Sequence, residues 1–197
     1  YSLNRSASLA KIEYQNGVKS TYFLNLNSEF YNLMEISQLK LVQKILNYGH
    51  EIGIHIDTSS NKVNDKDSLV KILNHQKKLF VNLFGLSPTA FSFHNPKEMD
   101  YSYEEDFYED LVNCYSKKFK DNLPYCSDSN GYWRFRRLKD VLNKASDFSL
   151  QVLTHPGWWQ DKKMSPRQKI VRCIYGRALS NIEEYDKEKE FGNRVNH

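Results

Sequence analysis

Three histidines each come at the end of a short apolar or alternating run of residues. They are His55 in HEIGIHIDTS, His94 in TAFSFHNP and His155 in LQVLTHPGWW. If each run is a β-strand of one α/β sheet or barrel, these histidines lie at or near the carboxyl ends of three strands, where the active sites of such folds are built. Imidazoles are both metal ligands and proton carriers. The pattern therefore favours a metal or acid–base site over three unrelated core histidines.

Two further polar residues belong to the first of these strands. Asp57 follows His55 closely and could be a second metal ligand or an acceptor that fixes the His55 tautomer. His50 lies at the start of the same strand, and its odd spacing from His55 places it on the other strand face. We interpret His50 as a structural histidine at a helix-to-strand corner. The alternatives for His55 and His94 are a buried histidine bonded to backbone and a loop-capping residue, respectively.

The segment YCSDSNGYWR adds a carboxylate and a guanidinium to the candidate site. Asp128 could orient His94 or His155, and Arg134 could bind a carboxylate group or pair with Asp128. An Asx-turn is an equally consistent role for Asp128.

Tryptophans accompany the polar residues. Trp158 and Trp159 follow a His-Pro-Gly turn, and Trp133 lies beside Arg134. The apolar faces of sugar rings stack on tryptophan, so these residues are candidate glycan contacts. The alternative for Trp158 and Trp159 is that they cover the end of the core.

The rest of the sequence predicts alternating helices and strands. Capping residues and apolar periodicity predict the following segments. The helices are 4–16, 36–48, 68–84, 136–145 and 165–187; the strands are 20–26, 51–56, 89–93, 125–127 and 150–154; residues 100–110 form a loop with a short helix. This order predicts an α/β fold with a mostly parallel sheet or barrel. Because the chain opens on a helix, we expect a preceding strand to be missing.

Composition narrows the class of protein. The 197 residues fit a single domain over 1–197, with ordinary hydrophobic (40%) and charged (26%) fractions. The net charge of +4 is scattered, so no nucleic-acid partner is predicted. No apolar run approaches the roughly 18–20 residues of a membrane span. Three cysteines without a CxxC pair suit a reducing compartment, and no export signal is visible, so we expect a cytoplasmic protein.

Four motifs together resemble the polysaccharide deacetylase superfamily (NodB-like, carbohydrate esterase family 4). They are GHEIGIH, a strand ending in His-Asn-Pro, SDSNGYWR, and a final strand ending in Thr-His-Pro. The resemblance runs from the first helix to about Trp159 and is closest to a divergent branch associated with bacterial surface-polysaccharide biosynthesis. It implies a distorted (β/α)7 barrel, here lacking the first strand. It also implies removal of acetyl groups from an N-acetylated sugar or polysaccharide with a divalent metal, usually zinc.

The resemblance also implies roles for individual residues. His55 matches the first metal-ligand histidine, but the second would fall at Ser59, a poor ligand, and His94 could replace it. His155 matches the histidine that acts as general acid, with Asp128 as its neighbouring carboxylate. The expected substrate-binding residues are Asp57, Asn95, Trp133, Arg134, Trp158 and Trp159.

The resemblance is incomplete at the amino end. The acidic pair that closes the first strand in the family is absent, so we expect a truncated chain that binds metal loosely and is weakly active. One alternative is a catalytically silent glycan-binding or scaffold protein on the same barrel. Another is a metal-dependent hydrolase that acts on a different leaving group.

Overall fold

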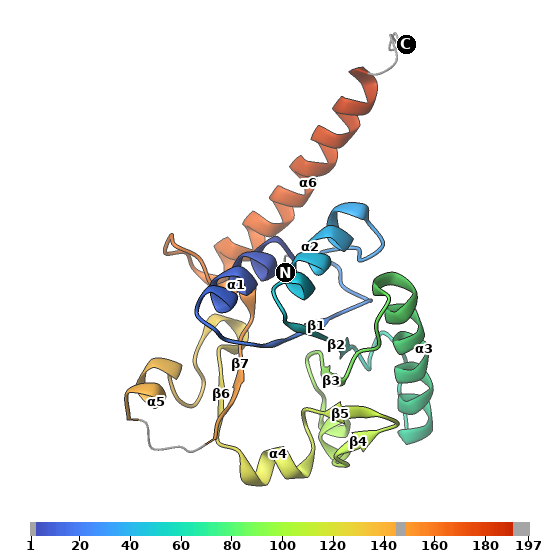
Figure 1. Cartoon of the computed structure of the whole chain (residues 1–197), viewed down its shortest axis with the longest axis vertical. Helices are drawn as coiled ribbons and strands as arrows, with labels where there is room; N and C mark the ends of the chain where they lie inside the picture. The colour runs from blue at the N-terminus through green and yellow to red at the C-terminus, as the bar shows by residue number, and fades with distance from the viewer. Residues whose placement is uncertain (1–2, 145–148, 191–197) are drawn as a thin grey trace.

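The computed structural model of the chain describes residues 3–144 and 149–190 as an α/β fold (Figure 1). The helices are α1 (Leu3–Gln15), α2 (Ile36–Asn47), α3 (Lys66–Phe84), α4 (Lys117–Asn122), α5 (Leu138–Lys144) and α6 (Pro166–Glu190). The strands are β1 (Thr21–Leu24), β2 (Glu51–Ile56), β3 (Ala90–Phe93), β4 (Phe107–Tyr108), β5 (Leu111–Asn113), β6 (Tyr125–Ser127) and β7 (Gln151–Leu153). Three 3-10 turns join them: η1 (Glu98–Ser102), η2 (Ser129–Gly131) and η3 (Pro156–Trp158).

The strands form two sheets. The larger has the order β1-β2-β3-β5-β4 and is parallel except for β4, which pairs antiparallel with β5. The smaller is the parallel pair β6-β7. The expected α/β class with parallel strands is therefore confirmed. Because the described strands divide into two sheets, a single closed barrel stays a prediction.

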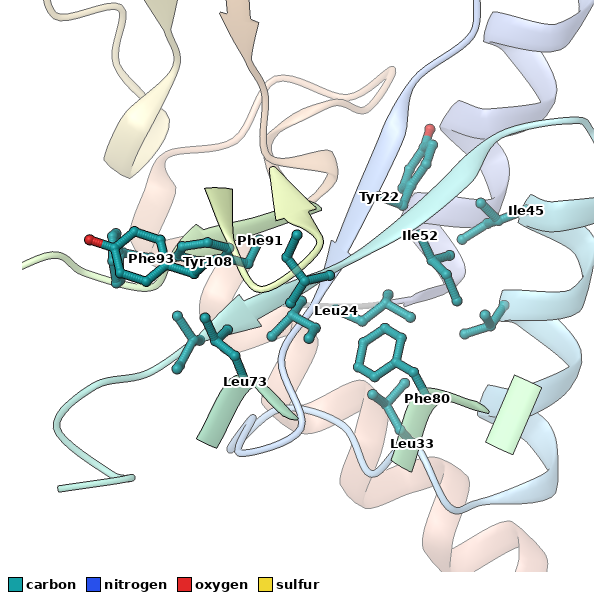
Figure 2. Packing of buried hydrophobic residues seen from close by; sticks show 14 of the residues in the cluster. Tyr22, Leu24, Leu33, Ile45, Ile52, Leu73, Phe80, Phe91, Phe93 and Tyr108 are labelled. Carbon is teal, nitrogen blue, oxygen red and sulfur yellow. The ribbon is translucent and has the colours of Figure 1, made fainter. Parts of the chain in front are cut away.

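The core lies between the larger sheet and its helices (Figure 2). All four residues of β3 are buried, as expected for a strand covered on both faces. Phe80 of α3 and Ile45 of α2 are fully buried near Ile52 of β2. α3 presents an apolar stripe to this core and is closed by a left-handed Gly85 with φ 72°.

Gly53 allows β1 and β2 to pack closely. A Cβ atom at this position would lie 2.6 Å from the Phe23 ring and 2.8 Å from the carbonyl oxygen of Ala90. Phe23 is the register partner of Gly53 across the β1–β2 pair. Packing therefore requires the second glycine of GHEIGIH, Gly53, which lies two residues before His55.

Some elements differ from the sequence prediction. Residues 100–110 were expected to be a loop with a short helix, and η1 is that short helix, but Phe107–Tyr108 is a strand of the β4–β5 hairpin. The hairpin turn places Glu109 at φ 56° without the Gly or Asn that usually marks such a turn. Helix α4 was not predicted either. The predicted helix 136–145 is shorter here, and its last residue lies outside the described part of the chain.

Within residues 3–144 and 149–190, no helix combines the length and apolarity that crossing a membrane requires.

Candidate functional site

The first two candidate histidines lie at adjacent strand ends. His55 is the second-last residue of β2, and His94 directly follows β3. These strands are parallel neighbours, with His55 in register with Ser92. The backbone N–H of His94 donates to the carbonyl oxygen of Ile56 at 2.7 Å, which extends the pairing past the end of β3. Two residues 39 positions apart in sequence are thus held side by side.

The two imidazoles face each other. Nε2 of His55 and Nδ1 of His94 are 3.2 Å apart, and the ring planes cross at 78°. The side-chain amide nitrogen of Asn95 lies 3.2 Å from Nε2 of His94. If that amide donates, Nε2 of His94 is an acceptor, its Nδ1 carries the proton, and Nδ1–H donates to His55. Asn95 adopts a left-handed φ of 46°, which turns the chain sharply beside the pair.

Burial keeps both imidazoles neutral. Desolvation, together with the neighbouring His94 and His155, lowers the pKa of His55 to about 3. Desolvation also lowers the pKa of His94, against a raising effect of the Asp57 carboxylate. Nδ1 of His55 is buried and makes no hydrogen bond of normal geometry to the described residues. A neutral imidazole is the form that binds metal ions.

The third histidine belongs to a hydrogen-bonded pair on the smaller sheet. Asp128 follows β6 and His155 comes two residues after β7. Oδ1 of Asp128 accepts from the backbone N–H of His155 at 2.9 Å and lies 2.7 Å from its Nδ1. Oδ2 accepts from Nε1 of Trp159 at 2.8 Å. The buried carboxylate therefore fixes both the tautomer and the orientation of His155, so that Nε2 is the ring nitrogen that can exchange a proton with a substrate.

The two histidine groups interact through charge. His155 contributes to the lowering of the pKa values of both His55 and His94. In both sheets the candidate residues lie at or just after the carboxyl ends of parallel strands, β2 and β3 in the larger sheet and β6 and β7 in the smaller. Asp128 contacts His155 and not His94, which decides between the two partners that the sequence allowed.

A metal ion fits the facing pair of histidines in part. Two nitrogens that each bind a tetrahedral zinc at about 2.0 Å are about 3.3 Å apart, close to the observed 3.2 Å. Binding through both facing nitrogens requires the other His94 tautomer, with the Asn95 amide turned so that its oxygen accepts. In the described part of the chain, no third His, Cys, Asp or Glu joins them. His55 and His94 thus suit two ligand positions out of the three that a catalytic zinc takes.

Two other predicted site residues, Asp57 and Arg134, make none of the hydrogen bonds to other described site residues that the sequence allowed. The Asp57 carboxylate accepts from the backbone N–H of Ser59 at 2.9 Å and from the hydroxyl of Ser60 at 2.8 Å, so it caps the turn after β2. It acts on His94 only through its charge. Arg134 is exposed, and the oxygens of Asp128 are already bound by His155 and Trp159.

The tryptophans divide between core and surface. Trp158 is buried, which fits the alternative of a core cover, whereas Trp159 is 42% exposed. Trp159 and Trp133 line one cleft of about 650 Å³, together with Arg137 and Lys139. One of its lining residues, Trp159, donates to Asp128, which is also the partner of His155.

Sequence reasoning missed the cationic wall of this cleft. The run WRFRRLK at residues 133–139 carries four positive charges and no negative one, and that density was the available signal.

Sequence reasoning also missed Asp100, which is fully buried. Oδ2 of Asp100 accepts from the Thr58 hydroxyl at 3.0 Å and from the Lys97 N–H at 2.7 Å, so it ties together the loops after β2 and β3.

His50 is structural, as predicted. Its Nε2 lies 2.8 Å from the carbonyl oxygen of Ala10, and its Nδ1 accepts from the backbone N–H of Ser20 at 3.2 Å. The ring is 4% exposed and joins α1, β1 and the start of β2.

Comparison with known proteins adds no relative: no protein-family model and no curated protein matches this chain.

Proposed function

We propose that this protein is a metal-dependent hydrolase that removes acetyl groups from an N-acetylated sugar or polysaccharide intermediate. The observation that carries the proposal is that a neutral histidine pair, His55 and His94, and a His155–Asp128 pair both lie at or just after the carboxyl ends of parallel strands. The first pair suits cation binding and the second suits proton transfer. The choice of an acetylated sugar rests on the sequence resemblance.

The division of roles follows from the contacts. A divalent cation held by His55 and His94 supplies a Lewis acid and a water of lowered pKa when bound. Asp128 holds Nδ1–H of His155 and so fixes the orientation of its ring, as a buried carboxylate does beside a catalytic histidine. Nε2 of His155 then carries the mobile proton and donates it to the departing amine nitrogen. Asp128 is a positioning residue in this scheme.

The cleft beside His155 accommodates the rest of the substrate. Trp159 and Trp133 offer apolar ring faces for sugars, and Arg137 and Lys139 offer donors to hydroxyl or acidic substituents. Since Asp128 binds both Trp159 and His155, the stacking surface and the proton donor keep a constant spacing. Such positioning of substrate against the catalytic group lowers the barrier to reaction.

The finer fold is part of the same proposal. We infer that the two sheets are arcs of one distorted (β/α)7 barrel, because in both sheets the candidate residues lie at or just after the carboxyl ends of parallel strands. The free thiols of Cys114, Cys126 and Cys173 support a reducing, cytoplasmic compartment.

One observation favours a second candidate, a catalytically silent glycan-binding protein. The described residues supply two metal-ligand histidines and no third ligand at that position. Acetate release separates the two candidates, since a binding protein retains oligosaccharides in the Trp133–Trp159 cleft without hydrolysing them.

Acetate released from N-acetylated oligosaccharides in the presence of zinc tests the enzyme. His155→Ala and Asp128→Asn should lower kcat by about 10²- to 10⁴-fold, whereas His75→Ala, an exposed histidine on α3, should leave it unchanged. Zinc titration by calorimetry tests the ligands. His55→Ala and His94→Ala should each abolish the zinc binding that His75→Ala retains. Equal zinc binding by all of these proteins rejects the assignment of ligands.

A further inference from the structure

Helix α6 carries an exposed apolar face. Its 25 residues project away from the rest of the described chain (Figure 1). At about 100° per residue, six of its apolar or small side chains fall within an arc of about 140°. We call this set the α6 stripe: Val171, Ile174, Tyr175, Ala178, Leu179 and Ile182. Ile174, Tyr175, Leu179 and Ile182 are 54–67% exposed.

The helix packs on the body with its polar face. Cys173, Gly176 and Arg177 line a cavity of about 330 Å³ against Leu3 and neighbouring residues. Arg177 also donates to the Glu35 carboxylate at 2.8 Å. A helix that contacts only its own domain buries its apolar side. In α6 the apolar side is directed to solvent instead, over at least three turns.

Charge along α6 points to a second copy as the occupant. The first half of the helix carries Arg167, Lys169, Arg172 and Arg177, a net charge of +4. The following turns carry five acidic residues and two lysines, a net charge of −3: Glu183, Glu184, Asp186, Lys187, Glu188, Lys189 and Glu190. Two antiparallel copies bring each basic half against an acidic half, whereas parallel copies bring like charges together. The acidic turns also oppose binding to an anionic lipid surface, which basic amphipathic helices prefer.

A two-fold axis near Ala178 gives a consistent register. Ile174 then lies opposite Ile182 of the second copy, and the small Ala178 side chains meet at the crossing point, where they allow close approach. On one flank, Arg172, whose guanidinium also donates to the side-chain oxygen of Gln160 in its own copy, lies near the opposing Glu183. A residue pair that repeats with its members exchanged is what an isologous dimer contact requires.

We propose that the α6 stripe pairs antiparallel with the α6 stripe of a second copy of this chain, forming a two-fold dimer. The projection of α6 from the described body suits this arrangement, because the second body attaches to the opposite end of the helix pair (Figure 1). The dimer is independent of the proposed hydrolase activity, since the stripe contains none of the histidines of the site.

Sedimentation equilibrium of the full chain, from about 1 to about 200 µM, tests the dimer. The native protein should change from monomer to dimer over this range. Ile182→Lys should remain monomeric, because pairing would bury its charge in an apolar seam. Ser180→Lys places the same charge on the opposite face of α6 and should dimerise like the native protein. Circular dichroism should show equal helix content in all three.

Charge reversal tests the orientation. Arg172→Glu and Glu183→Arg should each raise the dimer dissociation constant about tenfold, and the double variant should restore it. A chain that stays monomeric throughout, or a dimer that tolerates Ile182→Lys, overturns the proposal. Binding of the monomer to anionic lipid vesicles that Ile182→Lys abolishes would overturn it in favour of a membrane surface.

Discussion

Two hydrogen bonds of the His50 side chain hold together the amino-terminal part of the fold. The side chain reaches the carbonyl oxygen of Ala10 on α1 and the N–H of Ser20 next to β1. His50→Ala leaves both groups unsatisfied and opens a cavity, so we expect the free energy of unfolding to fall by about 2–4 kcal/mol. Urea denaturation measures this loss. His75→Ala removes an exposed histidine and should change stability by less than about 0.5 kcal/mol.

Gly53 sets the spacing between β1 and β2. An added methyl group would overlap the Phe23 ring and approach the Ala90 carbonyl oxygen, and both of these lie in the sheet. Gly53→Ala should therefore destabilise the protein by about 1–3 kcal/mol. Gly176 on α6 has open space around its Cα, so Gly176→Ala should be neutral or stabilising by up to about 1 kcal/mol. Equal effects at the two glycines in urea denaturation would contradict this account of Gly53.

At the scale of the element, α3 depends on its first turn. The Asp65 carboxylate accepts from the backbone N–H of Ser68 at 2.8 Å, and the Ser68 hydroxyl returns a contact to the N–H of Asp65 at 3.1 Å. Asp65→Ala should lower the free energy of unfolding by about 1 kcal/mol. Asp121→Ala, which removes an exposed carboxylate near the end of α4, is the matched control and should have little effect. If Asp65→Ala is as stable as this control, α3 does not depend on its cap.

Element length decides how well the sequence predicts structure. Strand β2 was predicted over the observed residues and α3 within two residues, because both are long enough for periodicity and end signals to agree. The two- and three-residue strands of the β4–β5 hairpin are too short to show a period. Position at a strand end was sufficient to find His55 and His94. For Asp128 the sequence left two partners open, His94 and His155, because the contact with His155 across 27 residues depends on the β6–β7 register.

At the scale of the whole molecule, burial holds titratable groups in their neutral forms. Desolvation raises the pKa of Cys114 to about 12, and it also raises the pKa values of Cys126 and Cys173. The native thiols should therefore react slowly with a disulfide reagent near pH 8, since the thiolate is the reactive form. Addition of guanidinium should make all three react quickly. A thiol that reacts fast in the native protein would contradict the burial of its side chain.

The same burial makes the free energy of unfolding depend on pH. An unfolded cysteine loses its proton near pH 9, whereas the folded Cys114 keeps its proton until about pH 12. Over this interval the folded state binds more protons, so the free energy of unfolding must fall as pH rises. The stabilisation is fully present below the unfolded pKa and is lost as pH rises toward the folded pKa.

Tyr22, whose hydroxyl donates to Glu13 at 2.5 Å, has a raised pKa and acts in the same direction. Urea denaturation from about pH 8 to about pH 10.5 should show this fall, with a smaller slope in Cys114→Ala. A free energy of unfolding that rises over this interval would mean that these groups are solvated in the native protein.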